Sequence, residues 1–257
     1  MKIGFFDSGL GGLLLLRAVS KVLPEYDYYY YGDTKNLPYG DKSDAQILEF
    51  TKQALEYLFA YECALVIVAC NTASVKAVRE LQDNWLLKKY PDRKLLGIVI
   101  PTVEYLLDNL NSSKQKVLLL ATDLTVKSGK YKNELQQRKV DNLIFYEKAT
   151  PDLVPLIESG NFGTATKRAV SYITEEGREV DSVVLGCSHY IKIKKHIQEK
   201  MPSRKIIGQD EIIPYKLKTY LEKHQEIEEI LSKNYNRQIY LTEHKDNYDT
   251  LIKEFLI

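Results

Sequence analysis

This chain of 257 residues has few cysteines and almost no net charge. Its three cysteines, Cys63, Cys70 and Cys187, are few and odd in number, so they do not form a disulfide framework. Lys and Arg number 36 against 35 Asp and Glu, and a net charge of +1 favours neither nucleic acid nor an anionic membrane as a partner. No apolar run reaches the roughly 18 residues of a membrane span, and the N-terminal stretch lacks the apolar core of a signal peptide. We therefore expect a cytoplasmic protein with reduced thiols.

Recognisable metal and nucleotide motifs are also missing. The cysteines form no CxxC pair and the four histidines are scattered, so the sequence predicts no metal site. No GxxxxGK[ST] occurs, and the turn at residues 7–12 lacks the third glycine of GxGxxG because Leu14 stands there. No lysine is marked out as a Schiff-base partner for pyridoxal phosphate. We expect a protein that needs no cofactor, with a turn whose backbone N–H groups suit a small carboxylate.

Short β-rich runs, in contrast, alternate with amphipathic stretches through the whole chain. Runs such as LVIVA, KVLLLA and SVVLG are continuously apolar, which is typical of parallel strands covered on both faces. The alternation predicts a parallel α/β architecture. The predicted strands are Lys2–Phe6, Asp27–Tyr31, Ala64–Ala69, Leu95–Val99, Lys116–Ala121, Leu143–Lys148, Ser182–Gly186 and Lys205–Ile207. The predicted helices include Ser43–Tyr61, Ala73–Lys89, Thr125–Arg138 and Phe162–Glu176.

The two halves of the chain repeat one order of predicted strands, polar turns and cysteines. A strand runs into Cys70 in the first half and into Cys187 in the second, and an earlier strand in each half ends in a polar turn, at Asp7 and at Thr122. The two spacings are nearly equal, which predicts two copies of one α/β unit. We place the first domain at residues 1–97 plus about 208–257, and the second domain at residues 98–207.

The three cysteines differ in what surrounds them. Cys63 has no polar neighbour of note in the sequence and is interpreted as a small buried hydrophobic residue. Cys70 and Cys187 each follow a strand, and ligands of open α/β sheets bind at the carboxyl ends of strands. Each is followed at once by hydrogen-bonding side chains and by a predicted helix start, which stabilise a thiolate. We interpret Cys70 and Cys187 as reactive groups.

Six ordered stretches resemble the glutamate racemases of the aspartate/glutamate racemase superfamily. They are GFFDSGLGG (4–12), YYYYGDTKNLPYGDKS (28–43), VACNTAS (68–74), ATDLTVKSGKY (121–131), TPDLVPLIESG (150–160) and LGCSHY (185–190). The resemblance implies two similar three-layer α/β domains with mostly parallel sheets and an active site in the cleft between them. It also implies a cofactor-independent isomerase, often a homodimer, that interconverts L-glutamate and D-glutamate and so supplies D-glutamate for peptidoglycan.

The resemblance assigns roles to individual residues. Cys70 and Cys187 match the two catalytic thiols, and Asp7 and His189 match the polar groups that assist proton transfer. Glu158 matches a carboxylate near the mouth of the cleft. The positions implied to bind substrate are Asp7, Ser8, Pro38, Tyr39, Gly40, Cys70, Asn71, Thr72, Thr122, Thr125, Cys187, Ser188 and His189.

Two thiols suit racemisation. The reaction takes a proton from one face of Cα and returns one to the other, so it needs an acid and a base on opposite sides. A free thiol with a pKa of about 8.5 is only a few per cent ionised at neutral pH. We therefore expect charged or hydrogen-bonding neighbours to enrich the thiolate, with His189 acting near Cys187. Hydroxyl, amide and backbone N–H donors stabilise the enolate-like state.

The chain departs from the resembled pattern at a few positions, and alternatives stay open. Ser188 stands where threonine is usual, Ile191-Lys192 replaces a common Pro-Leu, and Thr150 replaces a common cysteine. One alternative is an aspartate racemase of the same superfamily, although that subgroup commonly has glutamate where His189 stands. A second is a cysteine hydrolase with Cys187 as nucleophile, and a third is an amino-acid binder without catalysis. Neither of the last two needs a second thiol.

Overall fold

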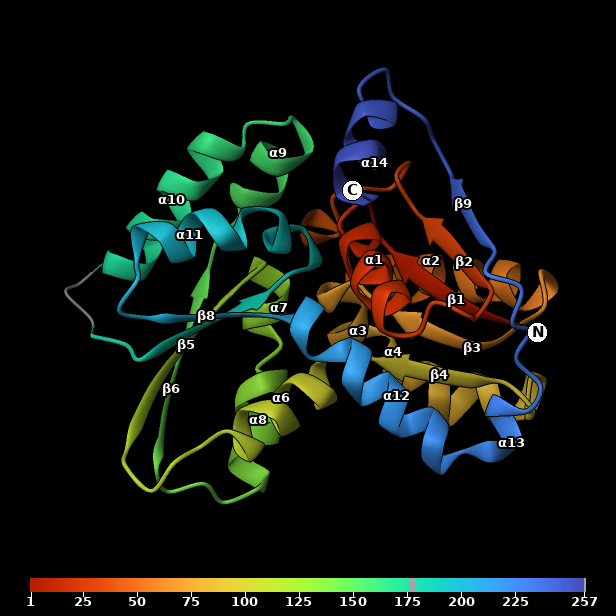
Figure 1. Cartoon of the computed structure of the whole chain (residues 1–257), viewed down its shortest axis with the longest axis horizontal. Coiled ribbons are helices and arrows are strands. Elements are labelled where there is room, and N and C mark those ends of the chain that lie inside the picture. Colours follow the sequence, from red (N-terminus) through yellow and green to blue (C-terminus); the bar gives the residue numbers. More distant parts are fainter. Residues whose placement is uncertain (176–178, 257) are drawn as a thin grey trace.

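The structure, a computed structural model, describes residues 1–175 and 179–256 and places their strands in two sheets (Figure 1). The strands are β1 (Lys2–Asp7), β2 (Tyr28–Gly32), β3 (Cys63–Val68), β4 (Lys94–Gly97), β5 (Gln115–Ala121), β6 (Leu143–Ala149), β7 (Ser182–Gly186), β8 (Lys205–Gly208) and β9 (Arg237–Leu241). In the first sheet the order is β4–β3–β1–β2–β9, and in the second it is β6–β5–β7–β8. All of these pairs are parallel. The predicted α/β fold class is confirmed.

The two sheets repeat one strand order. Read from the opposite edge, the second sheet is β8–β7–β5–β6, which matches β4–β3–β1–β2 of the first sheet. The strand that leads to Cys70 and the strand that leads to Cys187 therefore hold equivalent places, each beside the first strand of its own unit. The repeat of strands and cysteines in the sequence corresponds to this shared topology. The residue boundaries of the two domains stay a prediction.

Helices cover the sheets because the strands are apolar on both faces. In β1, Ile3 and Phe5 join the apolar cluster that includes α1 (Gly12–Val22), whereas Phe6 joins the cluster under α2 (Asp44–Ala60). Alternate residues of a strand point to opposite faces, so a continuous apolar run supplies both clusters. The first cluster extends into the second sheet, which packs the two units against each other.

Two predicted helices are interrupted. The stretch predicted as Thr125–Arg138 forms α7 (Asp123–Lys127) and α8 (Lys130–Gln137), because Gly129 between them adopts a φ of +62°. The stretch predicted as Ala73–Lys89 forms α3 (Asn71–Lys76), α4 (Val78–Leu81) and α5 (Leu87–Lys89), with a π-helical turn at Gln82–Leu86. The other helices are α6 (Val99–Asp108), α9 (Leu153–Glu158), α10 (Phe162–Thr174), α11 (Lys194–Lys200), α12 (Ile213–Lys223), α13 (Gln225–Glu228) and α14 (Tyr248–Leu256). Residue 176, the predicted end of the helix at α10, lies outside the described residues.

The C-terminal part of the chain returns to the first sheet. β9, which was not predicted, pairs in parallel with β2 at the sheet edge, and α14 packs on α1 (Figure 1). The start of α14 also reaches the end of α9 in the second unit, where the Asn247 side chain donates to the Glu158 carbonyl at 3.1 Å. Within the described residues, the helices are too short or too polar to cross a membrane.

Candidate active site

A cavity of about 100 Å³ lies where strands of both sheets end. It brings together most of the predicted site residues, namely Ser8, Pro38, Tyr39, Gly40, Cys70, Asn71, Thr72, Thr122, Cys187, Ser188 and His189. Three others, Asp7, Thr125 and Glu158, are absent from the lining and lie behind residues that form it. Because equivalent strands of the two units end here, each unit contributes one thiol to the same cavity.

Cys70 is held at the start of α3, where its thiol caps the helix. The Ala73 backbone N–H points to Cys70 Sγ at 3.4 Å, and the Ser8 hydroxyl lies 3.4 Å from the same sulfur. Burial raises the pKa of the Cys70 thiol to about 12, and the nearby charge of Asp7 raises it too, while the two donors lower it. The two hydrogen-bond donors therefore favour the thiolate, as expected, but burial and the charge of Asp7 outweigh them, so Cys70 is held as a thiol.

His189 is placed beside Cys187, as predicted. The chain turns immediately after β7, and this 3₁₀ turn (Ser188–Ile193) brings His189 Nδ1 to 3.8 Å from Cys187 Sγ. The other ring nitrogen, Nε2, lies 2.5 Å from Glu158 Oε1. Burial opposes protonation of the imidazole, but the hydrogen bonds with Cys187 and Glu158 raise the pKa of His189 well above its ordinary value. Cys187, His189 and Glu158 therefore form a chain along which a proton can move.

A glycine allows the first unit to approach this histidine. A Cβ atom at Gly11 would lie 2.5 Å from His189 Nδ1 and 2.6 Å from the His189 backbone nitrogen. Contacts this short do not occur for real Cβ atoms, and the backbone atom cannot simply rotate away. Gly11 in the turn after β1 is thus required for the close packing of the two units at the site.

Asp7 joins the two units behind the cavity. The Ser188 hydroxyl donates to Asp7 Oδ2 at 2.8 Å, and the Gly9 N–H donates to Asp7 Oδ1 at 2.8 Å. Burial raises the pKa of Asp7, although the charge of His189 and these hydrogen bonds oppose the rise. Because the Ser188 hydroxyl donates its proton to Asp7, its oxygen can only accept a hydrogen bond from a substrate in the cavity.

Hydroxyl and amide side chains connect the other strand ends. The Thr72 and Thr122 hydroxyls lie 2.9 Å apart across the two units, and the Thr122 hydroxyl donates to the buried Thr125 hydroxyl at 2.9 Å. Asn71 is held from behind, since its Nδ2 donates to Gln209 at 2.8 Å and its Oδ1 accepts from Tyr131 at 2.7 Å.

The loop after β2 contributes a wall to the cavity. The peptide bond before Pro38 is cis, and the buried Tyr39 donates its hydroxyl to Asp33 Oδ2 at 2.7 Å. Asp33 also accepts from Asn36 at 3.0 Å and from Thr242 at 3.0 Å. The Tyr39 hydroxyl is therefore committed to the loop, and the backbone of this loop is what remains for a substrate.

Sequence reasoning missed several residues of the site. Gln209 directly follows β8, so the rule that selected Cys70, a polar side chain after a strand, applies to it equally. Tyr131 lies at the end of one of the quoted stretches. Further lining residues next to or within those stretches are Leu37, Asp41, Asp123, Thr150, Pro151, Val154 and Pro155. Among the described residues, no group of three His, Cys, Asp or Glu side chains is arranged to hold a metal ion.

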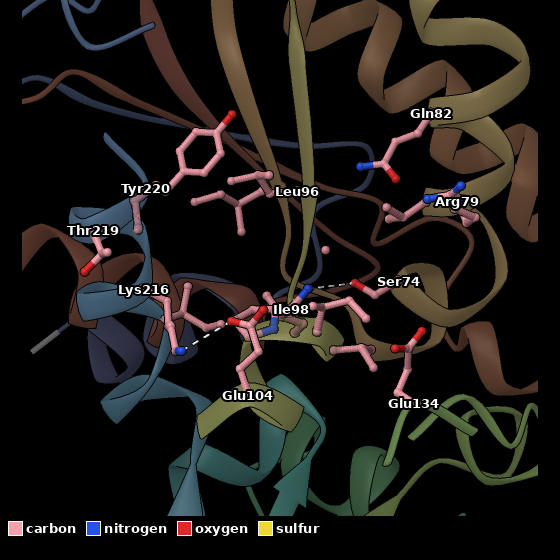
Figure 2. Close-up of a pocket in the computed structure, with 18 of the residues that line it drawn as sticks. Ser74, Arg79, Gln82, Leu96, Ile98, Glu104, Glu134, Lys216, Thr219 and Tyr220 are labelled. Carbon is pink, nitrogen blue, oxygen red and sulfur yellow. Dashed lines mark hydrogen bonds and ion pairs between the residues drawn. The ribbon is translucent and has the colours of Figure 1, made fainter. Parts of the chain in front are cut away.

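A larger cavity of about 500 Å³ lies away from the thiols, and α6 and α12 contribute to its walls (Figure 2). The Ile98 N–H donates to Ser74 at 3.4 Å near its floor, and Lys216 pairs with Glu104 at 3.2 Å on one wall. None of the residues that line it was predicted to be functional, and neither thiol faces it. The cavity that both thiols line is therefore the candidate active site, although it is the smaller of the two.

Two matching α/β units that each present a thiol to one cavity are the architecture of a two-domain amino-acid racemase. The chain belongs to the Asp/Glu/hydantoin racemase family, whose model matches residues 14–213. It is 32% identical to the glutamate racemase of Aquifex aeolicus over all of this chain and 94% of that protein. The structure of glutamate racemase from Francisella tularensis in complex with D-glutamate superimposes with a TM-score of 0.83 at 28% identity, covering 99% of this chain and 93% of that one. The Campylobacter jejuni glutamate racemase gives a TM-score of 0.82 at 26% identity, covering 100% and 98%.

Proposed function

We propose that this protein is a glutamate racemase that interconverts L-glutamate and D-glutamate with two thiols and no cofactor. The observation that carries the proposal is the placement of Cys70 and Cys187 at equivalent strand ends of the two units, on one cavity. The sequence relationship to glutamate racemases supports the choice of substrate. The D-glutamate produced would serve peptidoglycan synthesis, and we place the reaction in the cytoplasm, where the three free cysteines stay reduced.

In the proposed reaction, Cα of glutamate lies between the two sulfur atoms. Cys187 takes the Cα proton from L-glutamate, and the electron pair of the C–H bond moves into the carboxylate to give an enolate-like state. The Cys70 thiol then donates its proton to the opposite face, which yields D-glutamate and leaves a thiolate at Cys70. The reverse reaction begins from that thiolate. Each acid or base placed in this way contributes about 10²–10⁴ in rate.

His189 and Glu158 support the step at Cys187. His189, held by Glu158, lies 3.8 Å from the Cys187 sulfur, where it can exchange a proton with this thiol. Cys70 has no such partner among the described residues, and burial favours its thiol form. In the conversion of L-glutamate we therefore assign the base to Cys187 and the acid to Cys70.

The test is racemisation by purified protein, followed by optical rotation in H₂O and by incorporation of deuterium at Cα in D₂O. Cys70→Ala and Cys187→Ala should each stop racemisation, because the loss of either group interrupts both directions. Cys63→Ala is the matched control, since Cys63 is fully buried in β3 and absent from the cavity lining. Wild-type racemisation by Cys70→Ala would rule out the two-thiol mechanism.

We further propose that the protein is a homodimer. Exposed aromatic side chains at the edge of the first sheet support this, because Tyr61 is 46% exposed and Tyr240 is 37% exposed, and Tyr57 stacks on both. Light scattering coupled to size-exclusion chromatography measures the mass directly. A mass of about 30 kDa, that of one chain, would refute the dimer.

A further inference from the structure

Two buried polar atoms near His189 have no hydrogen-bond partner within the described residues. They are Glu158 Oε2 and the hydroxyl of Tyr248. Glu158 uses only its other oxygen, Oε1, which accepts from His189 at 2.5 Å and from the Leu10 N–H at 3.3 Å. Tyr248 begins α14 and is 1% exposed. Buried polar groups are paired in the great majority of cases, so two unpaired ones at the same place need an explanation.

The two atoms belong to neighbouring residues. Asn247 donates to the Glu158 carbonyl at 3.1 Å, which holds the start of α14 against the end of α9. Burial and the charge of Glu158 both raise the pKa of the Tyr248 phenol, so its hydroxyl stays protonated. Tyr248 thus offers a proton donor beside a carboxylate oxygen that lacks one.

The chain around Tyr248 is tied to both units of the site. Residues 242–256, here called the C-terminal segment, begin with Thr242, which donates to Asp33 behind the Tyr39 loop. Near the end of the segment, Glu254 pairs with Lys192 at 3.1 Å, and Lys192 lies in the same 3₁₀ turn as His189. The segment is therefore fixed at both ends by elements that build the cavity, and Tyr248 lies between the two ends.

We propose that Tyr248 is a positioning residue of the racemase, whose hydroxyl donates to Glu158 Oε2 and so holds the carboxylate that orients His189 toward Cys187. This inference rests on the proposed function. Both atoms are buried and face no competing partner among the described residues. Glu158 acts on the Tyr248 phenol through its charge and through a side-chain hydrogen-bond contribution, so the two side chains lie within reach of each other. With both oxygens engaged, Glu158 cannot rotate away from His189, and the imidazole stays aligned with the sulfur.

The matched pair of variants is Tyr248→Phe and Tyr26→Phe. Each removes one tyrosine hydroxyl beside a glutamate, because Tyr26 donates to Glu228 at 3.0 Å far from the cavity. We expect Tyr248→Phe to lower kcat about tenfold, the effect of losing a hydrogen bond to a charged group, and to leave KM nearly unchanged. Tyr26→Phe should change neither. Thermal unfolding of both variants shows whether the folds are intact.

The decisive readout is the primary isotope effect on kcat/KM, measured with L-glutamate and with D-glutamate that carry deuterium at Cα. If Tyr248 serves the Cys187 side, its loss makes proton transfer at Cys187 more rate-limiting. The isotope effect should then rise for the enantiomer from which Cys187 takes the proton, L-glutamate in the proposed assignment, and fall for the other. A general loss of structure lowers kcat without shifting the two isotope effects in opposite directions.

A double-variant comparison shows whether Tyr248 acts through Glu158 or independently of it. In a Glu158→Gln background, Tyr248→Phe should cause little further loss, because its target is already altered. Wild-type kcat and isotope effects in Tyr248→Phe would overturn the inference, and so would an equal loss of kcat in both backgrounds. Either result would leave racemisation and the two thiols untouched, whereas failure of the proposed function would appear as absence of activity in the unmodified protein.

Discussion

Glu158 and His189 form a buried pair in which Oε1 of the carboxylate lies 2.5 Å from Nε2 of the imidazole. Glu158 ends α9 and His189 lies in the turn after β7, so the pair connects two elements of the second unit. Burial alone would raise the pKa of Glu158 and lower that of His189. The hydrogen bond reverses both, since it lowers the pKa of Glu158 and contributes to the raised pKa of His189. The pair therefore couples the stability of the fold to pH.

The first prediction concerns the pH dependence of the free energy of unfolding. A raised histidine pKa stabilises the fold below the unfolded value of 6.5, and this contribution is lost as the pH rises through the folded pKa. A lowered glutamate pKa stabilises above 4.5 and is lost as the pH falls through the folded pKa. Glu158→Gln should therefore cost most stability between pH 4.5 and 6.5, and progressively less at alkaline pH.

Urea denaturation at pH 5.5 and pH 9 measures this difference. Glu226→Gln is the matched control, because Glu226 pairs with His224 at 3.2 Å on the surface, where ion pairs contribute little. We expect the control to match the unmodified protein at both pH values. A cost of Glu158→Gln that is the same at both would contradict the prediction.

The second prediction concerns the glycine that lets His189 approach. Gly11→Ala places a methyl group within 2.6 Å of the His189 backbone nitrogen, so the turn or the histidine must move. We expect kcat to fall at least about tenfold, since misplacement by about 1 Å costs up to 10² in rate. Gly163→Ala in α10 is the control, as its Cβ meets no described atom within 4 Å. Full activity of Gly11→Ala would show that the contact with His189 is dispensable.

The third prediction follows from the raised pKa of Cys70. In a Cys63→Ala/Cys187→Ala background, iodoacetamide reacts only with Cys70, and it reacts with the thiolate. With a pKa near 12, the rate should rise about tenfold per pH unit between pH 7 and 9 without levelling off. Mass spectrometry of quenched samples gives the rate, and free cysteine in the same buffer should begin to level off near its own pKa. A plateau for Cys70 below pH 9 would show that its hydrogen-bonding neighbours outweigh burial.

EDTA and hydroxylamine should leave the activity of the unmodified protein intact.

Much of this organisation could be predicted from the sequence, because apolar strands and polar strand ends are local signals. The eight predicted strands form, although β4 ends at Gly97 and the predicted strand end Val99 begins α6. The side chains that follow β1, β3, β5, β6 and β7 meet at one cavity. The strand β9 was missed because RQIYL lies at an exposed edge and lacks the apolar pattern of a buried strand. The break at Gly129 was missed because a helix pattern tolerates an isolated glycine until tertiary structure decides its φ.

Properties that depend on contacts between distant segments could not be predicted. The pKa of Cys70 is set mainly by burial, which two hydrogen-bonding neighbours in the sequence do not reveal. Tyr248 follows Glu158 by 90 positions, and only the return of the chain past β9 brings the two together. Gln209 and Tyr131 lie behind Asn71 for the same reason.

The last prediction is substrate choice. Glutamate and aspartate differ by one methylene, and apolar contacts discriminate one methylene by only about 1–3 kcal/mol. Stronger selection depends on the donors that meet the distal carboxylate, because a shorter substrate leaves them unpaired. The Thr72 hydroxyl donates to Thr122, because the Thr122 proton goes to Thr125, and the Tyr39 and Ser188 hydroxyls donate to Asp33 and Asp7. The backbone N–H groups of the Pro38–Gly40 loop, which lines the cavity, therefore remain for the distal carboxylate.

We therefore expect glutamate to be racemised with a kcat/KM at least about tenfold higher than aspartate, in line with a penalty of that size. Ser188→Thr should change activity only modestly, since threonine keeps the hydroxyl that donates to Asp7 at 2.8 Å and adds a methyl group. Deuterium incorporation at Cα in D₂O, measured by NMR for each amino acid under identical conditions, gives the ratio. Exchange into aspartate that equals or exceeds exchange into glutamate would assign the protein to the aspartate racemases, and would mean that the donors of the Pro38–Gly40 loop receive the shorter side chain.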